Sequence, residues 1–123
     1  MNTKQIEIGD KTYILTVTRG LSLRMAKVAP EFVKMAKKSN ANLTEEEEFN
    51  FAVDYSSSIY DNMDVLFYEM IKIHHKNISK ETSDKIYLRF CEEYNDVDSH
   101  LLAFFRTSFT DGIPRENKKT INW

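Results

Sequence analysis

Apolar residues recur every three or four positions along a stretch from about Thr44 to Lys76. They stand at Phe49, Ala52, Val53, Ile59, Tyr60, Met63, Leu66, Phe67, Met70 and Ile71. This spacing is typical of one face of an α-helix and differs from the alternation of a strand. Thr44, followed three residues later by Glu47, forms a capping box at the start of the run. The pattern predicts one long helix at the centre of the fold.

A second set of apolar residues lies off the main stripe of this predicted helix. A helix that is apolar on more than one side is either deeply buried or shared with another protein. Both interpretations stay open at this point. Under the second one, the candidate partner or oligomer surface consists of Phe51, Tyr55, Val65 and Tyr68.

The N-terminal segment alternates apolar and polar residues instead. Gln5–Ile8 and Lys11–Val17 read as two short strands, and Gly9-Asp10 between them is typical of a two-residue hairpin turn. An isolated hairpin is only marginally stable in water. We therefore expect this one to pack on the helices or to pair with another chain.

A helical pattern follows the hairpin, and Ser22 is the expected N-cap. Pro30 either kinks this helix or opens a second one as its first residue. Four basic residues lie close to one face and form a candidate interaction stripe: Arg24, Lys27, Lys34 and Lys38. The expected buried positions are Leu23, Ala26, Val28, Phe32, Val33, Met35 and Ala36.

Two shorter helices are expected after the central one. Thr82 or Ser83 is the candidate cap of the first, and Asp96 or Asp98 that of the second. The predicted fold is mainly α, with an N-terminal β-hairpin (about 5–17) and about four helices around the Thr44–Lys76 helix. It forms one domain over residues 1–109. From Thr110 onward the sequence does not support regular structure and predicts a flexible tail over 110–123.

Composition narrows the class of protein. A chain of 123 residues with 41% hydrophobic content fits one domain with one core. The net charge of -2 gives no general reason to expect nucleic acid or an anionic membrane as a partner. No apolar stretch approaches the roughly 20 residues of a membrane span, and we expect no signal peptide. Cys91 is the single cysteine, so we expect a buried structural thiol in a reducing compartment.

The distribution of charge is more informative than its total. The first 38 residues hold eight Lys or Arg and three acids, whereas residues 39–71 hold eight acids and no base. These are either ordinary solvated helix faces, or a basic helix attracts an acidic one within the chain or between subunits. The basic stripe lacks the context of a recognition helix, so nucleic-acid binding is not favoured.

No motif indicates catalysis. His74 and His75 are adjacent, which places them about 100° apart on a helix and makes a cationic helix end a better interpretation than a metal site. The three glycines form no phosphate-binding loop, and no serine sits in a G-x-S-x-G setting. We predict no catalytic, cofactor-binding or metal-binding residues and no enzymatic activity.

The order of elements resembles a known family. The strand pair IEIGDKTYILTVT, the basic helix LSLRMAKVAPEFVKMAKK, a long helix with an acidic start and a small helical C-terminal part are similar to the tail assembly chaperones of long-tailed (siphovirus-type) phages, in particular those of lactococcal siphophages. The similarity extends over Met1–Phe109 and rests on size, order and character of the elements.

The resemblance implies a small cytoplasmic protein of the host cell that binds and solubilises the tape-measure protein during tail assembly. It implies a homo-oligomer that is absent from the mature virion, with no membrane partner and no cofactor. The alternatives are a structural virion component, such as a head–tail connector, and a small nucleic-acid-binding regulator that uses the four basic residues of the stripe.

Overall fold

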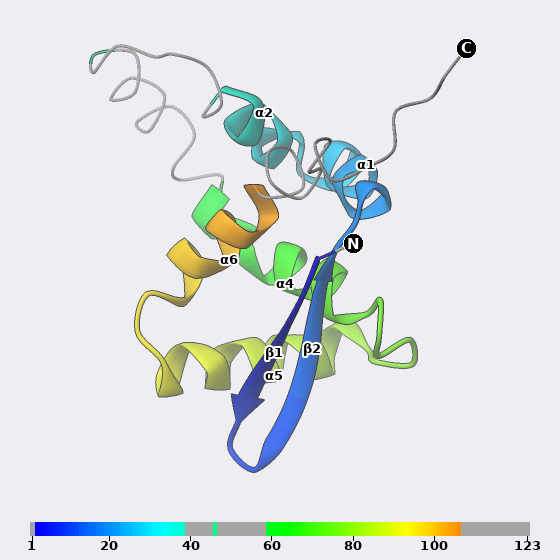
Figure 1. Cartoon of the computed structure of the whole chain (residues 1–123), viewed down its shortest axis with the longest axis vertical. Coiled ribbons are helices and arrows are strands. Elements are labelled where there is room, and N and C mark those ends of the chain that lie inside the picture. The colour runs from blue at the N-terminus through cyan, green and yellow to red at the C-terminus, as the bar shows by residue number, and fades with distance from the viewer. Residues whose placement is uncertain (1, 39–45, 47–58, 107–123) are drawn as a thin grey trace, which may run out of the picture.

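A computed structural model of the chain describes residues 2–38, 46 and 59–106. Over these residues the fold is mainly helical with an N-terminal antiparallel hairpin, as the sequence predicts (Figure 1). The predicted tail over 110–123 lies outside the described residues. The elements, in chain order, are β1 (Asn2–Ile8), β2 (Lys11–Val17), α1 (Arg19–Val28), α2 (Pro30–Lys38), α4 (Met63–Ile71), α5 (Lys80–Glu93) and α6 (Val97–Arg106).

The hairpin forms where the alternation predicts it, and β1 extends further toward the N-terminus than expected. Ile8 pairs with Lys11 across the two-residue turn. Gly9 has a φ of 65°, in the left-handed region that glycine adopts without a steric cost. The hairpin packs on the helices: β2 contacts α4, and β1 contacts α5, which it crosses in Figure 1.

Helix α1 begins earlier than expected, because Thr18 is its N-cap. The Thr18 hydroxyl accepts a hydrogen bond from the Leu21 backbone N–H at 3.0 Å. The expectation that Ser22 is the cap is therefore wrong, and the buried face of α1 also differs from the expected one. Leu21 and Met25 are the buried residues of α1.

Three of the expected buried residues lie on the outside of α1. Leu23, Ala26 and Val28 are exposed, whereas Phe32 of α2 is fully buried as expected. Leu21 and Met25 are four residues apart, so they form a second apolar stripe on α1, and this stripe is the buried one.

Pro30 opens a second helix, which confirms one of the two alternatives for this residue. Helix α1 ends at Val28, and Ala29 leaves the helical region with a φ of -153°. Pro30 is then the first residue of α2. A proline is well tolerated there because the first backbone N–H of a helix has no intrahelical acceptor.

The described residues do not show one continuous helix from about Thr44 to Lys76. Residues 44, 45 and 47–58 lie outside the description. Between 59 and 76, a turn at Asn62 precedes α4, which ends at Ile71. The Asn62 side-chain amide donates to Glu31 Oε1 at 3.3 Å, so the break is tied to α2 by a tertiary contact.

The early end of α4 also has a tertiary cause. Beyond Ile71 the chain turns and brings His75 against β2. The Ile14 backbone N–H donates to His75 Nε2 at 3.2 Å, and the His75 ring packs edge-on against Tyr13 with 5.7 Å between ring centroids. His75 therefore lies against β2, beyond the end of α4, and its ring contacts the hairpin.

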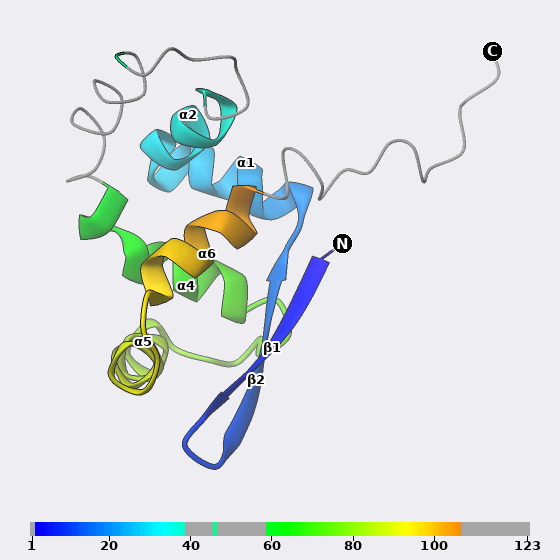
Figure 2. The ribbon, with the colours of Figure 1, turned by 60° about the vertical axis from the view of Figure 1, so that its left-hand side comes forward.

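Helix α4 is the most deeply buried element of the described fold. It packs against α1, α5 and β2, and α6 lies beside it between α1 and α5 in Figure 2. Aromatic contacts extend from it, since the Phe67 ring lies 6.0 Å from that of Phe90 on α5. Most of its residues are buried: Met63, Leu66, Phe67, Glu69, Met70 and Ile71.

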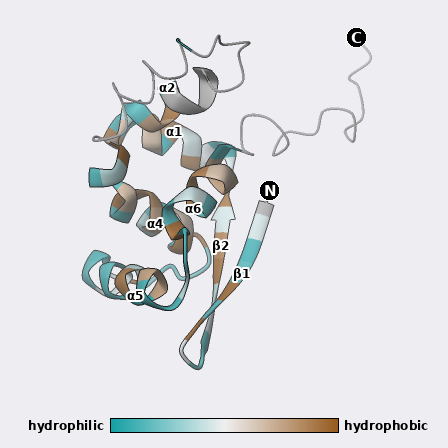
Figure 3. Cartoon of the chain, turned by 90° about the vertical axis from the view of Figure 1, so that its left-hand side faces the viewer, coloured by the Kyte–Doolittle hydropathy of each residue, from teal (hydrophilic) through white to brown (hydrophobic). Residues whose placement is uncertain are grey.

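Helix α5 is amphipathic and largely hydrophilic on its outer side (Figure 3). Its N-cap is Ser79, whose hydroxyl accepts from the Thr82 N–H at 3.1 Å, so neither Thr82 nor Ser83 caps it. Helix α6 begins directly after Asp96, one of its two candidate caps. Cys91 is exposed, which corrects the expectation of a buried thiol.

The cap of α1 is open to a direct test. Thr18→Ala removes the acceptor for the Leu21 N–H, and we expect it to lower the free energy of unfolding by about 1 kcal/mol. Ser22→Ala is the matched control, with an expected change of less than about 0.5 kcal/mol. Urea unfolding followed by circular dichroism measures both. Equal losses in the two variants would contradict the assignment of the cap.

Candidate functional site

The predicted surface on the central helix is partly covered. Phe51 and Tyr55 lie outside the described residues. Val65 is half-buried and packs against the hydrophobic core. Tyr68 is also half-buried, with the ammonium of Lys72 4.8 Å from its ring centroid. The described half of this surface therefore exposes little apolar area.

A buried carboxylate lies beside Tyr68 and joins α4 to α1. Glu69 is 4% exposed, and its two oxygens accept from Arg24 Nε at 2.9 and 3.1 Å. Lys72 Nζ lies 2.5 Å from Glu69 Oε1. Burial alone would raise the pKa of Glu69, but the hydrogen bonds from Arg24 and Lys72 outweigh it and hold the pKa below its ordinary value.

This ion cluster joins the basic and the acidic segments of the sequence. Arg24 belongs to the basic N-terminal segment and Glu69 to the acidic segment over 39–71, and the two residues pair within one chain. Arg24 and Tyr68, which the sequence assigns to two different surfaces, lie around the same carboxylate. Arg24 therefore has a structural partner, although its side chain is 60% exposed.

The outer face of α1 combines exposed apolar and basic side chains. Leu23 is 62% exposed and Val28 is 56% exposed. Together with Arg24 and Lys27 they line a shallow hollow of about 180 Å³. We call these four residues the α1 face. The sequence signals its two basic members, whereas Leu23 and Val28 were expected in the core.

The other two members of the predicted basic stripe lie on α2. Lys34 is exposed, and Lys38 is the last residue of that helix, with a side chain outside the description. The stripe is thus divided between two helices, which are separated by the non-helical residue Ala29. Arg24 and Lys27 line a common hollow.

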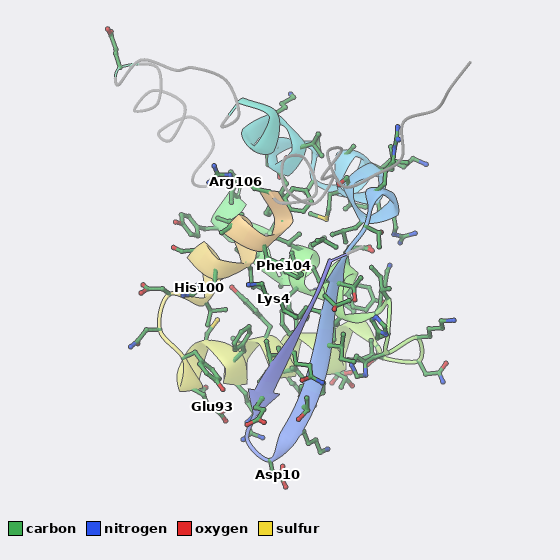
Figure 4. All side chains as sticks on the ribbon, viewed as in Figure 1. Lys4, Asp10, Glu93, His100, Phe104 and Arg106 are labelled. Atoms are coloured by element: carbon green, nitrogen blue, oxygen red, sulfur yellow. The ribbon has the colours of Figure 1, made fainter. Side chains whose placement is uncertain are left out.

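A larger groove lies beside β1, and no pattern in the sequence indicates it. It consists of two adjoining hollows of about 570 and 310 Å³ that share Ile6, Phe90 and His100. Figure 4 labels Lys4, His100 and Phe104 on its walls. The groove runs between β1, the C-terminal part of α5 and α6. We call it the β1 groove.

The exposed cysteine is a poor candidate for nucleophilic chemistry. Partial desolvation and the nearby Asp98 carboxylate raise the pKa of the Cys91 thiol, and a thiol rather than a thiolate is a weak nucleophile. The neighbouring Tyr87 donates its hydroxyl hydrogen to Asp98. Burial and this hydrogen bond raise the pKa of Tyr87. Within residues 2–38, 46 and 59–106, no group of three or more His, Cys, Asp or Glu is placed to hold a metal ion.

Comparisons with protein-family models, with curated proteins and with solved structures gave no match. In the part of the chain that the structure describes, no helix has both the length and the apolar character needed to cross a bilayer. Arguments about function therefore rest on the α1 face, the Glu69 cluster and the β1 groove.

The Glu69 cluster predicts a pH-dependent contribution to stability. Glu69→Gln keeps the shape of the side chain but removes the charge that pairs with Arg24 and Lys72, and we expect a loss of about 1–2 kcal/mol at neutral pH. Because the folded pKa lies below the ordinary value of 4.5, this contribution is present above about pH 4.5 and is lost as the pH falls through the folded pKa.

Urea unfolding at neutral and acidic pH measures the difference between the wild type and this variant. The matched control is Glu81→Gln, because the Lys85–Glu81 pair is 3.6 Å long and 75% and 82% exposed. Such pairs contribute little to stability, so we expect a change within about 0.5 kcal/mol. A Glu69→Gln effect that grows as the pH falls would contradict the assignment.

Proposed function

We propose that this chain is a non-enzymatic tail assembly chaperone of a long-tailed phage. It binds and solubilises the tape-measure protein while the tail is built, acts as an oligomer in the host cytoplasm and is absent from the mature virion. The proposal takes its client and its setting from the resemblance of Met1–Phe109 to that family. The α1 face is the observation in the structure that supports a binding role.

The α1 face has the chemistry that a chaperone of an apolar helical client needs. Leu23 and Val28 offer apolar area to water on one helix. An amphipathic client helix docks on such a surface through residues spaced three and four apart. Lys27 at the same hollow keeps the free surface soluble and is able to pair with an acidic residue of the client. The face is small, so several copies along a long client would act together.

A nucleic-acid-binding regulator is the weaker alternative. Phosphate contacts depend on free Arg and Lys side chains that line one surface. Arg24 is engaged with Glu69, and the remaining basic residues of the stripe are divided between α1 and α2. A structural virion component remains the first alternative, because it too would need exposed apolar surface for its neighbours.

Co-expression tests the proposal against both alternatives. We expect the protein encoded immediately downstream to become soluble and to co-elute with several copies of this chain in size-exclusion chromatography with light scattering. If the downstream protein stays insoluble and this chain is found in purified virions, the structural alternative holds instead.

Substitutions on the α1 face locate the client surface. Leu23→Glu combined with Val28→Glu places two carboxylates on the exposed apolar area, and we expect the yield of soluble complex to fall about tenfold or more. Leu88→Glu is the matched control, since Leu88 is 59% exposed on α5. Equal loss in both variants would mean that the α1 face has no special role. Circular dichroism checks that both variants remain folded.

Self-association tests the role of the charge asymmetry between subunits. We expect Lys34→Glu combined with Lys38→Glu to weaken oligomers if basic helices meet acidic segments of neighbouring chains, because it replaces attraction by repulsion. Sedimentation velocity at low salt measures the oligomer, and Lys85→Glu on the exposed side of α5 serves as the control. Sedimentation unchanged by the double substitution would contradict this mode of assembly.

A further inference from the structure

We propose that the outer edge of β1 and the β1 groove bind an extended segment of a partner protein as an added antiparallel β-strand. The proposal concerns a different surface from the α1 face and does not depend on the identity of the client. It rests on the direction of the backbone groups of β1, on the groove beside them and on the charges at its two ends.

Hydrogen-bonded and non-hydrogen-bonded residue pairs alternate along the hairpin, and this alternation shows which backbone groups of β1 point outward. In an antiparallel pair, residues that exchange hydrogen bonds alternate with residues whose N–H and C=O point away from the partner strand. Gln5 lies opposite Ile14, but the Ile14 N–H donates to His75. Glu7 lies two residues from Gln5, so its backbone groups point the same way, and its carbonyl accepts a hydrogen bond from the Tyr94 hydroxyl at 2.7 Å. The outward groups of β1 therefore belong to Thr3, Gln5 and Glu7.

The two edges of the hairpin differ in how these groups are satisfied. The edge of β2 packs against α4 and uses the Ile14 N–H in the contact with His75. On the edge of β1, Tyr94 occupies the Glu7 carbonyl, but among the described residues the outward groups of Thr3 and Gln5 have no hydrogen-bond partner. An unpaired edge of this kind is a template for another strand.

The β1 groove supplies the side-chain pocket that strand addition needs. Residues of an added strand that lie opposite Lys4 and Ile6 would point to the same side as these two residues, because side chains alternate along a strand. That side holds the apolar lining of the groove. The lining consists of Ile6, Phe90, Val97, Leu101 and Phe104.

The charges along β1 indicate the composition of the partner, and the antiparallel direction then sets the order of its residues. Lys4 lies at one end of the groove with its ammonium 5.6 Å from the Phe104 ring centroid, and Glu7 lies at the other end. Directly opposite residues of paired strands interact, and opposite charges stabilise the pair. An antiparallel partner is thus basic opposite Glu7, apolar opposite Ile6 and acidic opposite Lys4. Read from its N-terminus, it has the pattern basic, apolar, polar, acidic, polar.

The peptide acetyl-Lys-Ile-Thr-Glu-Thr-amide is a probe with this pattern. The full chain is labelled with ¹⁵N and titrated with the peptide to millimolar concentration. In NMR spectra, the amide resonances of Thr3, Gln5 and Glu7 should shift. N-methylation of the third peptide residue, whose N–H faces Gln5, should weaken binding about tenfold. N-methylation of the second residue is the matched control, because that N–H points away from β1, and it should leave the affinity unchanged.

A pair of variants at Gln5 tests whether the β1 edge binds the peptide. Gln5→Pro removes an outward N–H without removing a hydrogen bond to β2, so the hairpin should persist. We expect about tenfold weaker binding of the probe to this variant. Gln5→Thr keeps the N–H and a residue suited to strands, and it should bind as the wild type does. Circular dichroism and the β2 amide resonances report whether Gln5→Pro keeps the fold.

Four outcomes would overturn the proposal. One is the absence of shifts at Thr3, Gln5 and Glu7 with the unmodified probe. Another is equal weakening by the two N-methylated peptides. In the chain without peptide, slow hydrogen exchange of the Gln5 amide at every protein concentration would mean that the edge is already occupied within the chain. Protection that rises with protein concentration would assign the edge to a second copy.

Discussion

The described fold depends on the burial of α4 from several sides. A nine-residue helix with six buried residues cannot cover itself, so α1, α5 and the hairpin must each contribute a face. One of the buried residues is Glu69, and a buried carboxylate is costly unless it is paired and hydrogen-bonded. Arg24 and Lys72 meet this requirement, and the Arg24 contact joins α1 to α4. The orientation of α1 in turn leaves Leu23 and Val28 facing solvent.

Ion pairs within the chain also neutralise part of the charge asymmetry. Asp64 on α4 pairs with Lys80 on α5 at 2.7 Å, and Glu69 pairs with Arg24 and Lys72. Two acids of the segment over 39–71 thus find bases from other parts of the sequence. Among the described residues, these pairs form within the chain, while Lys34 is exposed on α2.

The sequence was sufficient for elements whose signal is local. The hairpin turn at Gly9 and the mainly helical class follow from short-range patterns, and Pro30 takes one of the two roles that its sequence context allows. It was insufficient where a tertiary contact decides. The break at Asn62 and the end of α4 at Ile71 accompany contacts with Glu31 and with β2, and helical periodicity carries no information about either.

The candidate site was anticipated only in part, for a similar reason. Arg24 and Lys27 were predicted as surface residues and are exposed, but α1 has two competing apolar stripes, and the stripe that contains Met25 is buried. The choice follows from how α1 packs on α4, a tertiary contact that periodicity within α1 does not reveal. The β1 groove was inaccessible to sequence reasoning because its walls come from β1, α5 and α6, which are distant along the chain.

The two exposed surfaces differ in the kind of partner they suit. The α1 face is a helix surface, which suits a helical partner with matching apolar spacing and charge. The β1 edge offers backbone groups, which pair with an extended chain of almost any sequence, and the groove beside it adds the selectivity. A protein that handles a long, incompletely folded client would benefit from both, because such a client presents helical and extended segments at different stages. Covering Thr3 and Gln5 with the client would also protect an edge that otherwise invites aggregation.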